Sequence, residues 1–125
     1  MPSYGRKKHS FSFAATGTSY VDWDIDFVNW LFHSWVVQVP TFSGDTTSNS
    51  GCSGINISII DEDGYVLYTS TEYPSAGTVV VTGMDSLMGA GREITIRAQL
   101  AGGSTIVEVP HPEANADVIL VLYIW

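Results

Sequence analysis

A β-hairpin is predicted by residues 55–69, which read INISIIDEDGYVLYT. The first half alternates isoleucine with asparagine and serine, and this period of two places the isoleucines on one face of a strand. Asp63 and Gly64 form the predicted turn, because Asp-Gly is among the strongest short hairpin signals and glycine adopts a positive φ without steric cost. Residues 65–69 then return as the second strand, so the chain pairs here with its own neighbour in antiparallel fashion.

Strand patterns of the same kind continue on both sides of this hairpin. We expect further strands at residues 10–14, 20–27, 34–39, 78–82, 92–100, 105–109 and 117–125. Only the short segments 28–32 and 85–88 have a helical pattern. Many strands joined by turns containing glycine and proline predict an all-β fold, an antiparallel β-sandwich with jelly-roll-like connections. A small closed β-barrel is the alternative.

Two of the predicted strands differ in their pattern. Residues 20–27 alternate aspartates with Trp23, Ile25 and Phe27, so we expect the aspartates to face water and the large side chains to face the core. Residues 118–125 read VILVLYIW without alternation, which predicts that both faces of this strand are covered. Loops of the same chain or a second subunit could provide the outer cover, and both alternatives stay open.

The chain has 125 residues, which is the size of one domain. Its charged fraction of 14% is well below the usual value of about 25%. The formal net charge is −8, and three of the five basic residues lie at positions 6–8. We therefore predict a basic N-terminal arm of residues 1–9 and a single β-sandwich domain of residues 10–125. A short basic arm on an acidic body is typical of proteins that assemble with an acidic neighbour.

Several classes of protein are excluded by the same composition. A broad basic surface for nucleic acid is not expected at this charge balance. No segment approaches the roughly 20 apolar residues of a membrane-spanning helix, and no apolar stretch follows the basic cluster as it would in a signal peptide. We therefore expect a chain made in a cytoplasm, without a membrane partner.

No catalytic or metal-binding signature is present. Cys52 is the single cysteine, which excludes a disulfide framework and a multi-cysteine metal site. The histidines lack zinc-ligand spacing, and the acidic turn 61–63 lacks the later ligands of a calcium loop. Neighbouring aspartates on one strand face do not provide a general acid and base across a cleft. We expect no enzyme activity, no cofactor and no metal.

Four features of the sequence are shared with a class of small β-proteins. They are the segment AATGTS at 14–19, the aspartate-rich strand 20–27, the hairpin 55–68 and the apolar final strand 118–125. With them the chain resembles the small β-sandwich proteins of tailed-bacteriophage particles, which decorate heads or build necks and tails. The resemblance implies a non-enzymatic structural role, many copies and contacts with other subunits of the particle. It identifies no single functional residue.

We therefore expect a virion structural protein that packs against itself and against a major capsid or tail subunit. The predicted interface residues are the arm residues Arg6, Lys7 and Lys8 and the apolar anchors Trp30, Leu31, Phe32 and Trp125. Large aromatic side chains are enriched at protein interfaces. The alternative is a carbohydrate- or receptor-binding module, which would present several aromatic side chains in a shallow groove.

Overall fold

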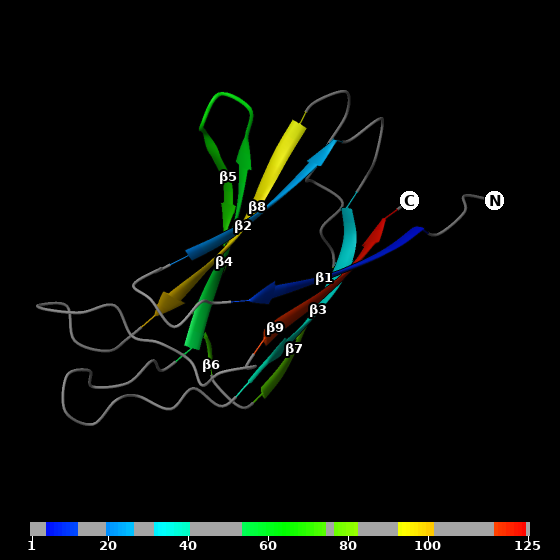
Figure 1. Cartoon of the computed structure of the whole chain (residues 1–125). Helices are drawn as coiled ribbons and strands as arrows, with labels where there is room; N and C mark the ends of the chain where they lie inside the picture. The colour runs from blue at the N-terminus through cyan, green and yellow to red at the C-terminus, as the bar shows by residue number, and fades with distance from the viewer. Residues whose placement is uncertain are drawn as a thin grey trace, which may run out of the picture.

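The computed structural model of the chain describes residues 5–12, 20–26, 32–40, 54–74, 77–82, 93–101 and 117–124. These residues form strands and turns, with no helix among them. The strands are β1 (Gly5–Ser12), β2 (Tyr20–Asp26), β3 (Phe32–Val39), β4 (Gly54–Asp61), β5 (Val66–Thr69), β6 (Tyr73–Pro74), β7 (Gly77–Val81), β8 (Glu93–Ala101) and β9 (Asp117–Ile124) (Figure 1).

The strands form two antiparallel sheets that pack face to face (Figure 1). The first sheet has the order β1-β9-β3-β7, and the second has the order β2-β8-β4-β5, with β6 paired to β4. Strands that follow each other in sequence mostly belong to different sheets, and the β4–β5 hairpin is an exception. This alternation across two layers, one of four strands and one of five, is the connectivity of a jelly roll. The predicted β-sandwich is confirmed, and the described strands do not close into a barrel.

The core lies between the two sheets and is almost entirely apolar. Along β8 and β9, and along β4 from Ile55 to Ile59, the buried side chains occur at every second position, as a sheet with one covered face requires. Full burial of one large apolar side chain stabilises the fold by about 1.5–3 kcal/mol. The largest fully buried side chains are Trp35, Phe11, Phe32, Ile55, Ile57, Ile59, Ile94, Ile96, Leu120, Leu122, Val37 and Val118.

One polar pair is built into this core. The indole Nε1–H of Trp35 donates a hydrogen bond of 3.1 Å to the hydroxyl oxygen of Tyr73. Burial raises the pKa of Tyr73 to about 12, so its hydroxyl stays protonated. Tyr68 packs edge-on against Trp35, with ring centroids 5.6 Å apart. A tryptophan is accommodated in the core because its donor has a buried acceptor.

The N-terminal segment differs from the sequence expectation. Residues 5–9 belong to β1, where they pair with β9 in a register that runs from Gly5 opposite Ile124 to Ser12 opposite Asp117. The predicted boundary between an arm of residues 1–9 and a domain of residues 10–125 therefore falls inside a strand. The charged run is compatible with a strand because β1 lies at the edge of its sheet, where lysines discourage pairing with other chains.

Other predictions are met in part. The hairpin is confirmed, with Gly64 at φ 88° in its turn, whereas the short strand β6 was not predicted. The helical candidates 28–32 and 85–88 and the strand candidate 105–109 lie outside the described residues. Phe32 is the exception, since it begins β3.

Candidate functional site

The outer face of the second sheet is polar, and its side chains bind one another. Arg97 donates two hydrogen bonds to the carboxylate of Asp22, of 2.8 Å from Nε and 3.1 Å from a terminal nitrogen. This contact raises the pKa of Arg97. The guanidinium also lies 4.1 Å from the ring centre of Tyr20. Such an exposed pair contributes little to stability, but it leaves this arginine and this aspartate already partnered within the chain.

The same pattern continues along this face. The hydroxyl of Thr95 donates a hydrogen bond of 2.7 Å to Asp24, and the hydroxyls of Ser58 and Thr69 lie 3.4 Å apart. Asp22 and Asp24 of β2 thus face outward, as the alternation predicts. This face has the chemistry of a surface that stays in contact with water.

The outer face of the first sheet carries a cluster of apolar side chains, which Gln38 and Thr78 border on one side. Along β9 the residues at 118, 120, 122 and 124 are buried in the core, so Ile119, Val121 and Tyr123 face outward. Val121 lies opposite Val36 of β3, and Val36 lies opposite Val80 of β7. Val80 is 63% exposed. We call the outward side chains of Val36, Val80, Ile119, Val121 and Tyr123 the apolar face.

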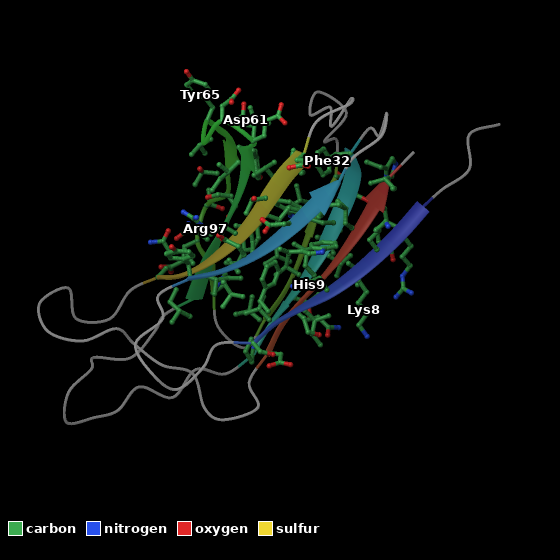
Figure 2. The ribbon with its side chains drawn as sticks, turned by 45° about the horizontal axis from the view of Figure 1, so that its top comes forward. Lys8, His9, Phe32, Asp61, Tyr65 and Arg97 are labelled. Atoms are coloured by element: carbon green, nitrogen blue, oxygen red, sulfur yellow. The ribbon has the colours of Figure 1, made fainter. Side chains whose placement is uncertain are left out.

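Two basic side chains border the apolar face on its β1 side. Arg6 lies opposite Tyr123 and Lys8 lies opposite Val121. Phe11 faces the core, and Arg6 and Lys8 lie at odd spacings from it along β1, so their side chains face outward. Both are exposed. Figure 2 shows Lys8 pointing away from the sandwich. We call Arg6 and Lys8 the basic edge. Lys7 lies between them in sequence and therefore has the opposite orientation along the strand.

A pocket of about 520 Å³ lies at the end of the apolar face, and its described lining residues are Arg6, His33, Ser34 and Tyr123. We call it the end pocket. It forms where β3 has an irregularity, because the pairing with β9 shifts between Phe32 and Ser34 and leaves His33 as an extra residue. Ser34 is a buried polar residue whose hydroxyl lies 2.9 Å from Nδ1 of His33. A bulge of this kind commonly turns a side chain toward a functional surface.

A second depression, of about 370 Å³, is acidic. Asp24, Asp61, Glu62 and Glu93 contribute to its lining. No group of three or more histidines, cysteines and carboxylates in the described part of the chain is arranged to hold a metal ion. This depression adds to the acidic character of the second sheet around the β4–β5 turn.

The β4–β5 turn forms an exposed projection at one end of the sandwich (Figures 1 and 2). Tyr65 is 70% exposed and Val66 is 59% exposed, and Leu67 is exposed beside them. Three acidic residues precede them in the turn. We call residues 61–67 the hairpin tip. The exposure of the hairpin tip was not predicted from the sequence. The signal was the run Tyr-Val-Leu, which lacks the alternation expected of a strand with one face in the core.

The turn itself is held by several hydrogen bonds. Asp61 Oδ1 accepts the backbone N–H groups of Asp63 at 3.0 Å and of Tyr65 at 2.8 Å. The backbone N–H of Asp61 donates to the carbonyl of Tyr65, and that of Gly64 donates to the carbonyl of Asp61. The hairpin tip therefore presents its apolar side chains from a defined backbone conformation.

The predicted interface residues have different locations. Arg6 and Lys8 lie on the basic edge, whereas Lys7 does not share their face. Phe32 is 1% exposed and packs in the core, so almost none of its surface is available to a partner. Trp30, Leu31 and Trp125 lie outside the described residues.

The described tryptophans, Trp23 and Trp35, face the core and do not line a sugar-binding groove. Trp35 is buried. Trp23 packs against the core and stacks on His9, with ring centroids 4.7 Å apart and the planes 2° from parallel. Burial lowers the pKa of His9, which favours the neutral ring in this stack. Tyr20 and Tyr65 are the most exposed of the described aromatic residues, and they lie on separate elements.

No helix in the described part of the chain is long and apolar enough to span a membrane. Comparison with known proteins gives no family model that matches the chain and no curated protein that matches it. The contrast between the two outer faces is therefore the starting point for its function.

Proposed function

We propose that this chain is a non-enzymatic structural protein of a virus particle, a capsid decoration or tail component of a bacteriophage. It assembles in multiple copies and packs its apolar face against a neighbouring subunit. The observation that carries this proposal is the contrast between the apolar face and the polar, internally hydrogen-bonded face on the opposite side of the sandwich.

The physical basis is the removal of the apolar face from water. Burial contributes about 25 cal/mol per Å² of apolar surface, before the costs of association. Contiguous apolar patches on otherwise polar proteins mark contact sites. The apolar face extends over three strands from β9 to β7, which gives it the breadth of a contact surface. Its basic edge favours a neighbour with acidic residues at the corresponding positions.

The viral context is supported by the fold and by the sequence resemblance together. Jelly rolls are used by viral capsid domains, and also by lectins and cupins, so the fold alone does not assign a function. The sequence resemblance to small β-proteins of phage particles favours the first of these uses. A major capsid or tail subunit is the proposed partner besides the chain itself.

The proposal is tested by a charge placed on the apolar face. In Val121→Glu the new carboxylate points outward from a central strand, so the fold should persist while self-association is lost. Ser58→Glu is the matched control, because Ser58 also points outward from a central strand but on the polar face. Sedimentation velocity gives the association state, and far-ultraviolet circular dichroism verifies folding.

We expect the wild-type protein and Ser58→Glu to associate and Val121→Glu to be a folded monomer. Equal association of all three proteins would contradict an interface on this face. The viral assignment is tested separately by mass spectrometry of purified particles from the source virus, in which the chain should be present in many copies. Its absence from the particles would overturn that assignment.

The carbohydrate- or receptor-binding alternative calls for several exposed aromatic side chains in one groove. Among the described residues, Trp23 and Trp35 face the core instead, and Tyr20 already contacts Arg97. A glycan array on the purified protein distinguishes the two functions. Specific binding of a sugar by the isolated chain would favour the alternative over a purely structural role.

A further inference from the structure

We propose that the hairpin tip of one copy of this chain inserts into the end pocket of a second copy. This inference rests on the proposed function, since the end pocket belongs to the apolar face. It goes further by identifying the second copy as an occupant and by naming the segment that enters.

The hairpin tip has the properties of an inserting segment. Tyr65 and Val66 are the two most exposed large apolar residues of the second sheet. Figure 2 shows Tyr65 projecting at the end of the hairpin. The hydrogen bonds of Asp61 fix the turn before any partner is present, and a segment that is already ordered loses less conformational freedom on binding. Tyrosine is also among the residues that contribute most at interfaces.

The end pocket has the properties of a receiving site. Its volume of about 520 Å³ lies within the range of about 300–1,000 Å³ that accepts compact ligands, so it has room for a tyrosine side chain and part of a neighbour. Arg6, His33, Ser34 and Tyr123 are its described lining residues, and the surface that lines it is mainly apolar. Tyr123 provides an aromatic ring against which a second tyrosine can pack.

The charges of the two surfaces are opposite. The hairpin tip carries Asp61, Glu62 and Asp63, whereas the pocket is flanked by the basic edge, Arg6 and Lys8. The chain as a whole has a net charge of −8, so an approach of two copies is repulsive in most orientations. Insertion of the acidic tip beside the basic edge is an orientation that reverses this repulsion.

The arrangement of the sheets makes this contact intermolecular. The hairpin tip extends the second sheet (Figure 1), whereas the described lining residues of the end pocket belong to β1, β3 and β9 of the first sheet, so tip and pocket lie on different sheets of the sandwich. A tip therefore fills the pocket of another copy. Each copy offers one tip and one pocket, and such contacts form a reciprocal dimer, a closed ring or a continuous array.

Three variants test the insertion. Tyr65→Ser removes the inserted side chain but leaves the pocket intact. Arg6→Glu/Lys8→Glu reverses the charge of the basic edge but leaves the tip intact. Tyr20→Ser is the matched control, because it removes another exposed tyrosine of the second sheet. All the changed side chains are exposed, and circular dichroism verifies that each variant is folded.

We expect Tyr65→Ser and Arg6→Glu/Lys8→Glu to weaken self-association by more than about tenfold in Kd, as removal of a central interface residue does. Tyr20→Ser should associate like the wild type. An equimolar mixture of the two defective variants should form heterodimers in native mass spectrometry, because one variant retains the pocket and the other retains the tip.

The outcomes separate this inference from the proposed function. If Tyr65→Ser associates normally while Val121→Glu does not, the apolar face is an interface and the insertion is wrong. Failure of the mixed variants to form heterodimers also overturns the insertion. If the wild-type protein is monomeric at every concentration, both proposals fail. If the wild-type protein binds a sugar and Arg6→Glu/Lys8→Glu does not, a sugar occupies the pocket. That result would overturn the insertion as well.

Discussion

At Gly54 the backbone of β4 lies directly against that of β6. An added Cβ would overlap the carbonyl oxygen of Tyr73, and backbone atoms cannot move aside as the end of a flexible side chain can. We predict that Gly54→Ala lowers the free energy of unfolding by about 1–3 kcal/mol, the usual cost of overpacking. Urea unfolding monitored by tryptophan fluorescence measures this change.

Gly77 supplies the control for this prediction. It lies in the edge strand β7, where an added Cβ would meet the carbonyl oxygen of Pro74 at 3.4 Å, an ordinary contact. Gly77→Ala should therefore leave stability nearly unchanged. Equal destabilisation by both variants would show that loss of glycine, and not the approach of β6, determines the effect.

His9 makes stability depend on pH. Its ring stacks on Trp23 and meets Phe11 edge-on, with ring centroids 4.8 Å apart, and burial lowers its pKa below the ordinary value of 6.5. The unfolded chain therefore binds a proton more readily than the folded chain. The contribution of His9 is complete above pH 6.5 and decreases as the pH falls through 6.5 toward the lower pKa of the folded state.

We predict that His9→Phe removes this part of the pH dependence and retains the aromatic packing. The measurement is the urea midpoint at about pH 7.5 and about pH 5, on either side of the ordinary histidine pKa. The wild-type midpoint should fall more on acidification than that of His9→Phe. An identical decrease in both proteins would mean that His9 does not couple folding to protonation.

At the scale of the elements, the sequence predicts local pairing better than distant pairing. The β4–β5 hairpin was predicted because all its signals lie within residues 55–69. Strand β6 was missed because it has only two residues, and its pairing with the start of β4 is a tertiary contact. The start of β1 was missed because three consecutive charged residues resemble a solvated terminus. Its pairing with β9, more than a hundred residues away, makes it a strand.

The candidate site illustrates the same limit. The apolar pattern of residues 118–125 predicted that both faces of the final strand are covered. In the structure, every second side chain of β9 packs in the core, and the outward side chains Ile119, Val121 and Tyr123 belong to the apolar face. The end pocket could not be predicted, because it combines side chains from β1, β3 and β9 at an irregularity of the β3 pairing. No local pattern in the sequence indicates this irregularity.

The structure changes what a truncation of the N-terminus should do. Deletion of residues 1–9 removes the first five of the eight register pairs between β1 and β9, Gly5 to His9. We predict that this deletion destabilises or unfolds the protein, because it uncovers the edge of β9. Thermal unfolding followed by circular dichroism measures the loss.

The variant Arg6→Ser/Lys8→Ser removes two charges of β1 but keeps its pairing with β9, so it tests the effect of the charges alone. Both side chains are exposed, so this variant should unfold within a few degrees of the wild type, since exposed substitutions usually change stability by less than about 0.5 kcal/mol. A deletion variant as stable as the wild type would show that residues 5–9 act as an arm after all.

At the scale of the whole molecule, the two sheets share one core. Side chains from both sheets pack in the same buried cluster, so neither sheet can keep its apolar face covered without the other. We predict a single unfolding transition in urea, with coincident curves from tryptophan fluorescence and far-ultraviolet circular dichroism. Two separated transitions would show that the sheets unfold independently.

Refolding should be slow for a chain of this size. Apart from the β4–β5 hairpin, the main strand pairs join segments far apart in sequence, and proteins dominated by such pairs fold in milliseconds to seconds. Stopped-flow fluorescence measures the rate. A microsecond refolding phase that accounts for the whole signal change would contradict this expectation.

The position of β1 has a practical consequence for any work that immobilises or labels this protein. Lys7 and Lys8 are the only two lysines in the chain, and both lie in the strand that borders the apolar face. Amine-directed dyes, cross-linkers and sensor surfaces will therefore attach beside the proposed contact and can block it. Coupling through an engineered cysteine at Ser58, on the opposite face, in a Cys52→Ser background keeps the apolar face accessible.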